Sequence, residues 1–131
     1  MSDDPPPPSH PCPFLVRQPT ELVISGPVGW LMRKMGWAGF TVPVPFVGTV
    51  ILYWRDEPRG YEEFWSRPHP SERYHELVHA QQIAKHGALW YVTTWLYDTA
   101  VLGYNSPFHR IESPAREATE AAEMQGWPEW V

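Results

Sequence analysis

The spacing of apolar residues divides this chain into extended segments in its first half and helical segments in its second half. Residues 40–54 are rich in β-branched and aromatic side chains and contain two prolines, which predicts strand, best defined over residues 47–54. Residues 21–24 form a shorter apolar run, which predicts a short strand or the lead-in to a helix. A short two-faced helix is predicted over residues 27–35, and a helical turn is expected at residues 61–65.

A long helix is predicted over residues 72–86. Ser71 is its expected N-cap, because a serine hydroxyl can accept a hydrogen bond from the first turn, and Gly87 is its expected end. Its apolar stripe comprises Tyr74, Leu77, Val78 and Ala84.

Two further helices are predicted downstream. The first covers residues 88–102, where apolar and small residues recur at helical spacing, namely Leu89, Val92, Trp95, Leu96 and Thr99. The second covers residues 111–125, with Pro114 in its first turn, where a missing N–H has no helical partner anyway. These elements predict an α+β fold, in which a small N-terminal β-sheet packs on the helix at 72–86 and two more helices follow.

The composition supports one domain with a separate N-terminal segment. The chain has 131 residues, of which 43% are hydrophobic and eight are Trp, so a substantial core can be buried. Residues 1–19 are expected to form a Pro-rich flexible tail, and residues 20–131 to form the domain. The Pro-rich N-terminus and the C-terminal tryptophans, Trp127 and Trp130, are candidate contacts for a protein partner, although these tryptophans could equally fold back onto the core.

Charge and cysteine content exclude several classes of protein. The net charge of −5 argues against nucleic-acid binding, which needs a cationic surface. Cys12 is the only cysteine, so the chain cannot form an intramolecular disulfide. The apolar stretch at residues 88–104 is short for a bilayer span and contains Asp98, and the N-terminus does not resemble a signal peptide. We therefore expect a cytoplasmic protein that is not transmembrane.

The sequence His75-Glu76-Leu77-Val78-His79 carries the candidate chemistry. Two histidines four residues apart lie about one helical turn apart, so their rings can meet at one metal ion. Glu76 lies roughly 100° around the helix, where it can reach a metal-activated water as a general base. This spacing is typical of zinc hydrolases, in which zinc has three protein ligands and an open fourth position.

The third ligand must come from another part of the chain. A glutamate on a later helix is a common solution, and Glu112 lies 33 residues after His79 (112 − 79) at the start of the predicted third helix. His109, Glu117 and Glu120 are the alternatives. His86 is on the same helix as the motif, but it lies about 10 Å from His79 along the axis, too far to bind the same ion.

The motif, the Ala80-Gln81-Gln82 that follows it, and the later Ile111-Glu112-x-x-Ala115-Arg116 resemble a minimal gluzincin. The chain is similar over residues 36–125 to the small HExxH metallopeptidase-like proteins of bacteria and bacteriophages. The resemblance implies a zincin-like fold, one Zn²⁺ ion bound by His75, His79 and Glu112, and Glu76 as the base. Pro114 within the third-ligand motif is a departure from the family.

The resulting expectation is a zinc-dependent metallopeptidase acting on a peptide or protein substrate. Tyr104 and His109 are the candidate donors to the oxyanion of the reaction, and residues 47–54, if they form the edge of the sheet near the cleft, could pair with an extended substrate. Trp90, Trp95 and Tyr97 are expected to pack in the core, while Gln81 and Gln82 could bond a ligand histidine or face solvent.

The rival hypothesis is a zincin-like assembly module, for example in a phage particle or secretion device, with little or no catalytic activity.

Overall fold

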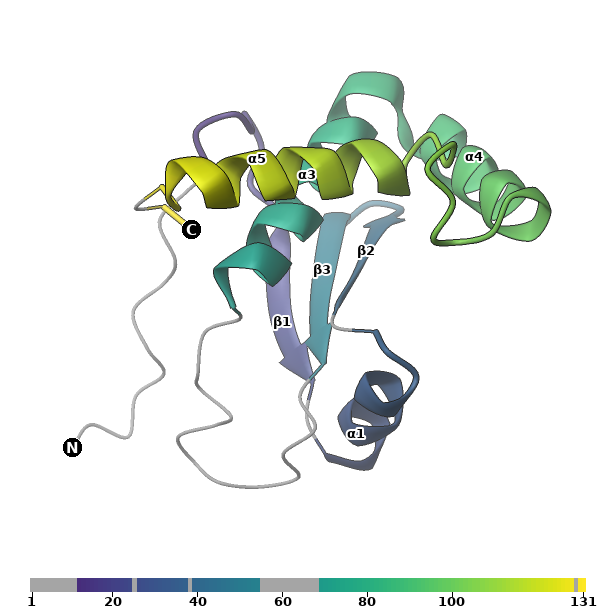
Figure 1. Cartoon of the computed structure of the whole chain (residues 1–131), viewed down its shortest axis with the longest axis horizontal. Coiled ribbons are helices and arrows are strands. Elements are labelled where there is room, and N and C mark those ends of the chain that lie inside the picture. The colour runs from purple at the N-terminus through teal and green to yellow at the C-terminus, as the bar shows by residue number, and fades with distance from the viewer. Residues whose placement is uncertain (1–11, 25, 38, 55–68, 129) are drawn as a thin grey trace.

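The computed structural model describes residues 12–24, 26–37, 39–54, 69–128 and 130–131. The helical turn expected at residues 61–65, and residues 1–11 of the expected tail, lie outside the described residues. Within them the chain is α+β, with strands in the first half and the longer helices in the second half (Figure 1). The elements are β1 (Thr20–Ile24), α1 (Gly26–Lys34), β2 (Gly39–Val44), β3 (Gly48–Trp54), α3 (Pro70–His86), α4 (Ala88–Val101) and α5 (Glu112–Gln125).

The three strands form one mixed sheet in the order β1-β3-β2. β1 is parallel to β3 and β2 is antiparallel to it, with Leu22 opposite Leu52 and Thr41 opposite Ile51. The predicted strand over residues 40–54 is therefore a hairpin of β2 and β3. Because β3 is paired on both sides, the prediction that residues 47–54 form a substrate-binding edge is wrong.

Helix α3 forms where the sequence predicts it, but with a different N-cap. Pro70 occupies its first turn, and the side chain of His69, not Ser71, accepts the hydrogen bond from the backbone N–H of Ser71, at 3.1 Å. The helix ends at Gly87, whose backbone has φ 92° and whose N–H donates to the carbonyl of Ile83. Only glycine adopts this left-handed backbone without strain, so the predicted end of the helix is confirmed.

The main core lies between α3 and the sheet. Leu77 and Ala80 of α3 pack with Ile51 and Tyr53 of β3 in one buried cluster. Cys12 and Leu15 belong to the same cluster, and the side chain of Gln18 holds the backbone of both of these residues. The described part of the expected tail, residues 12–19, is therefore packed into the domain and not separate from it.

Helix α4 turns only part of its predicted periodic set, Trp95 and Thr99, towards the rest of the protein. Leu89, Val92 and Leu96 are exposed, whereas its buried residues are Tyr91, Thr94 and Asp98. Tyr97, expected in the core, is 60% exposed. None of the helices in the described ranges combines the length and the apolar character needed to cross a membrane.

The C-terminal tryptophans fold back onto the domain. The Trp130 ring packs against Phe14 and Tyr74, with centroid distances of 5.3 and 5.7 Å, and Trp127 lies 6.0 Å from Tyr74. These contacts fix the end of the chain beside the first turns of α3. Of the two roles considered for these residues, the internal packing role accounts for their positions.

Candidate metal centre

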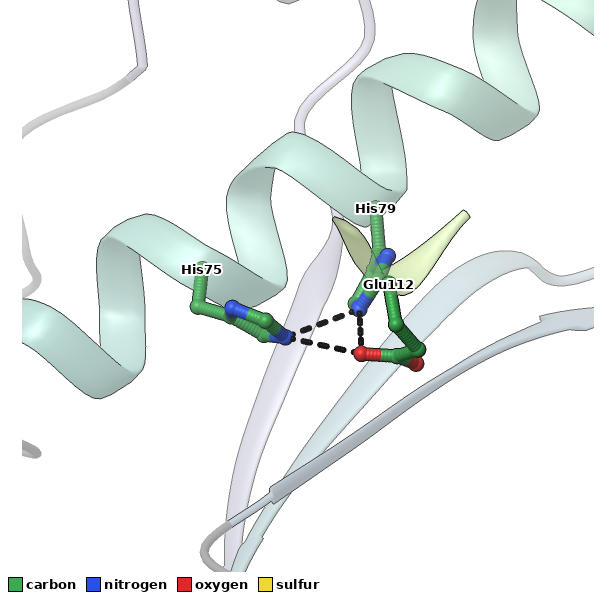
Figure 2. Close-up of side chains that lie close together, drawn as sticks. All are labelled: His75, His79 and Glu112. Carbon is green, nitrogen blue, oxygen red and sulfur yellow. Dashed lines mark hydrogen bonds and ion pairs between the residues drawn. The ribbon is translucent and has the colours of Figure 1, made fainter. Parts of the chain in front are cut away.

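His75 and His79 point to the same place from one side of α3. Their Nε2 atoms are 3.1 Å apart, and their ring planes are nearly perpendicular at 88° (Figure 2). His79 is buried, whereas the side chain of His75 is 17% exposed to solvent. The helical spacing of the motif therefore produces the convergence that the sequence predicts.

Glu112 reaches this point from the first turn of α5. Its Oε1 atom lies 3.1 Å from Nε2 of His75 and 3.3 Å from Nε2 of His79, which closes a triangle of three ligand atoms (Figure 2). Pro114 is accommodated because it lies in the first turn of α5, as the sequence predicts. Of the candidate third ligands, Glu112 is the one that joins this cluster.

The triangle fits a small transition-metal ion. Zinc bonds of about 2.0–2.2 Å in a tetrahedron place neighbouring ligand atoms about 3.3–3.6 Å apart, slightly more than the 3.1 and 3.3 Å between these three atoms. Two imidazoles and one carboxylate also suit zinc better than calcium or magnesium, which prefer all-oxygen sites. The three side chains could therefore hold a metal ion.

The outer atoms of two of these side chains are held by neighbours. Nδ1 of His79 lies 2.8 Å from Oε1 of Gln82, so a proton on Nδ1 leaves Nε2 unprotonated and able to bind a metal. Gln82 in turn donates to the carbonyl of Ile111, directly before Glu112. Trp95 donates its indole N–H to Oε2 of Glu112 at 2.8 Å. Of the two roles expected for Gln82, a bond to a histidine of the motif or exposure to solvent, the structure shows the bond to His79.

Glu76 lies beside the cluster, on the side that faces the sheet. Its side chain is buried, and the hydroxyl of Thr41 in β2 donates to Oε1 at 2.6 Å. A Cβ atom added at Gly39 would lie 3.3 Å from both Cγ and Oε2 of Glu76, so β2 passes directly against this carboxylate. Thr41 and Gly39 were missed by the sequence analysis, because nothing in the pattern of β2 shows which helix it packs against.

The pKa values of these groups follow from burial and from their mutual contacts. Burial raises the pKa of Glu76, although the nearby His79 and His75 act in the opposite direction. Burial would also raise the pKa of Glu112, but hydrogen bonds from His75 and His79 outweigh it and hold that pKa below its ordinary value. Glu112 is therefore a carboxylate at neutral pH, the form in which it can bind a cation.

Two cavities meet at the cluster. A small one of ≈ 20 Å³ is lined by Glu76, His79, Glu112 and Tyr104, and a volume of this size holds about one water molecule. A larger groove of ≈ 330 Å³ lies between α3 and α5, where His75 and Glu76 form part of its wall. The cluster is thus reached from a groove large enough for a small ligand or a substrate side chain.

The two predicted oxyanion donors lie in different environments. Tyr104 lines both cavities. Burial raises the pKa of its hydroxyl, and the negative charges of Glu112 and Glu76 raise it further, so the hydroxyl keeps its proton. Arg116 fixes its loop by donating to the carbonyls of Tyr104 and Ser106.

His109 is fully buried, and both of its ring nitrogens are already engaged. Nδ1 accepts from the backbone N–H groups of Ile111 and Glu112, and Nε2 lies 3.0 Å from the hydroxyl of Thr99. His109 therefore fixes the start of α5, and this position argues against the expected donor role and against its role as third ligand.

Comparison of this chain with known protein families, with curated proteins and with solved structures finds no match.

Proposed function

We propose that this chain is a zinc-dependent metallopeptidase that hydrolyses peptide bonds. The observation that carries the proposal is the triangle of His75, His79 and Glu112 atoms, with edges of 3.1, 3.1 and 3.3 Å, beside the buried carboxylate of Glu76. A zinc ion held there would lower the pKa of a bound water and polarise a substrate carbonyl.

Glu76 is the general base of this proposal. A buried carboxylate with a raised pKa accepts a proton more readily than an exposed one, and it can pass the proton to the leaving amine. Because the Thr41 hydroxyl already donates a hydrogen bond to Oε1 of Glu76, Oε2 is the oxygen that takes the proton. Thr41 thereby fixes the orientation of the base.

Tyr104 is the proposed donor to the oxyanion that forms when the carbonyl is attacked. It lines the small cavity together with Glu76 and Glu112, and its raised pKa keeps the phenol protonated. The substrate approaches along the groove between α3 and α5, which is lined in part by His75 and Glu76.

The test is a comparison of the parent with Glu76→Gln on a library of unstructured peptides. Glutamine preserves the size of the side chain and its bond to Thr41, but it cannot accept the proton. We expect turnover to fall by about 10²–10⁴-fold, the usual contribution of a general base, with unchanged zinc content by elemental analysis. A chelator should abolish the parent activity and added zinc should restore it.

Glu117→Gln is the matched control. Glu117 is an exposed glutamate on α5, so this change removes the same charge without touching the cluster. The mechanism is wrong if Glu76→Gln cleaves peptides as fast as the parent does.

The second candidate is the assembly module, and one observation favours it. The outer face of α4 presents exposed apolar side chains, with Leu89 79%, Leu96 57% and Val101 60% exposed, as docking surfaces often do. A zinc-loaded parent that cleaves no peptide in the library would favour this candidate over the peptidase.

A further inference from the structure

Trp95 is the half-buried residue of α4 whose contact with Glu112 the proposed mechanism does not use. Its indole N–H donates to Oε2 of Glu112 at 2.8 Å, while Oε1 of the same carboxylate faces both histidines. An indole nitrogen can only donate, so it cannot itself bind a metal. The two oxygens of Glu112 are therefore assigned to different partners.

The indole is held firmly in this orientation. Its ring lies edge-to-face with Phe40 at 5.9 Å, with Tyr104 at 6.3 Å and with His109 at 6.4 Å. These rings come from β2 and from the loop before α5, so two separate segments of the chain contact Trp95. Its N–H cannot turn away from Glu112 without breaking these contacts.

We infer that Trp95 is a positioning residue that keeps Glu112 a one-oxygen ligand of the metal. A carboxylate with both oxygens free can bind a metal through both, which adds a ligand atom and fills a further coordination position. With Oε2 engaged by Trp95, the protein supplies two nitrogens and one oxygen, and a fourth position stays open for water. The inference rests on the zinc site of the proposed function, but not on peptide cleavage.

The test is Trp95→Phe, which keeps an aromatic ring and removes the N–H. We expect zinc affinity, measured by competition with a chromophoric chelator, to fall about 10–100-fold, the usual effect of losing a partner of a metal ligand. In the Co²⁺-loaded protein, the visible absorption should weaken and shift, because a second Glu112 oxygen raises the coordination number. A residue that only packs would leave this spectrum unchanged.

Trp90→Phe is the matched control. Trp90 lies on the same helix and packs against the same buried cluster of Ile83, Tyr91 and Ile111, so it reports the cost of the smaller ring alone. If Trp95→Phe does not fold, benzothienylalanine at position 95 keeps the ring shape and replaces the N–H with sulfur.

The outcomes separate this inference from the proposed function. A parent that binds zinc and cleaves nothing refutes the peptidase but leaves the role of Trp95 intact, provided that the Co²⁺ spectrum changes in the variant. Equal zinc affinity and an identical Co²⁺ spectrum in Trp95→Phe and parent would overturn the inference. A parent that binds neither metal would overturn both.

Discussion

Helix α3 contributes to two polar clusters, and they balance charge in different ways. Towards the sheet, the guanidinium of Arg73 binds both oxygens of Glu21, at 2.9 and 3.0 Å, and also donates to the carbonyl of Trp130. The hydroxyl of Tyr53 completes the set by donating to Glu21 at 2.7 Å. This cluster contains its own cation.

The other cluster contains two buried carboxylates, Glu76 and Glu112, and two histidines, with no arginine or lysine among the side chains that form it. Buried carboxylates are costly unless a positive charge compensates them. The first cluster is therefore complete as a structural tie, whereas the second needs protons or a metal ion. The two clusters therefore differ in one respect: the first has a built-in counter-charge and the second does not.

The largest expected effect comes from removing the built-in cation. Arg73→Met leaves the Glu21 carboxylate without its charge partner and should lower the free energy of unfolding by about 3–5 kcal/mol, measured by urea denaturation. Arg33→Met, which breaks the more exposed ion pair with Glu72, is the control and should cost about 0–1 kcal/mol. Equal losses in the two variants would contradict the difference drawn between the clusters.

A smaller effect is expected from supplying the missing cation. Zinc at about a hundredfold excess over its dissociation constant should stabilise the parent by about 2.7 kcal/mol, seen as a raised midpoint of thermal unfolding. His79→Ala should lose this response, because it removes one corner of the ligand triangle. His86→Ala, an exposed histidine on the same helix, should retain it. A response that survives in His79→Ala would place the zinc elsewhere.

The smallest expected effect concerns a third ion pair, in which Asp98 binds both the backbone and the side chain of Arg110. The hydrogen bond from the Arg110 side chain lowers the pKa of Asp98 from 3.8 to about 2. A lowered folded-state pKa gives stability that is present above pH 4 and is lost as the pH falls towards 2. The gap in unfolding free energy between parent and Asp98→Asn should therefore be constant from pH 7 to pH 5 and shrink below pH 4. A gap that widens on acidification would reverse this assignment.

Much of the local structure could be predicted from the sequence. The bounds of α3, α4 and α5 match the predicted ranges to within about two residues, because glycines and prolines at their ends act through local backbone geometry. The convergence of His75 and His79 also follows from local geometry, since any helix places residues four apart on one side.

Packing between elements could not be predicted in the same way. Of the residues whose helical spacing predicted α4, Leu89, Val92 and Leu96 are exposed, whereas Trp95 contacts Glu112. The inner side of α4 combines packing of Tyr91 in an apolar cluster with polar contacts to other segments, such as Asp98 with Arg110 and Trp95 with Glu112. A periodic pattern identifies a helix, but it does not show which side meets the rest of the protein when most of its residues are apolar.

The sequence by itself determined that two imidazoles and an adjacent carboxylate share one helix, because helical geometry depends only on neighbouring residues. Tertiary structure decided the rest of the site, including the convergence of Glu112 on those imidazoles, the contact of Thr41 with Glu76 and the donation from Trp95. These contacts join residues 17 to 37 positions apart in the chain, so they depend on how the helices and the sheet pack. Packing is a property of the whole fold, and no short stretch of sequence encodes it.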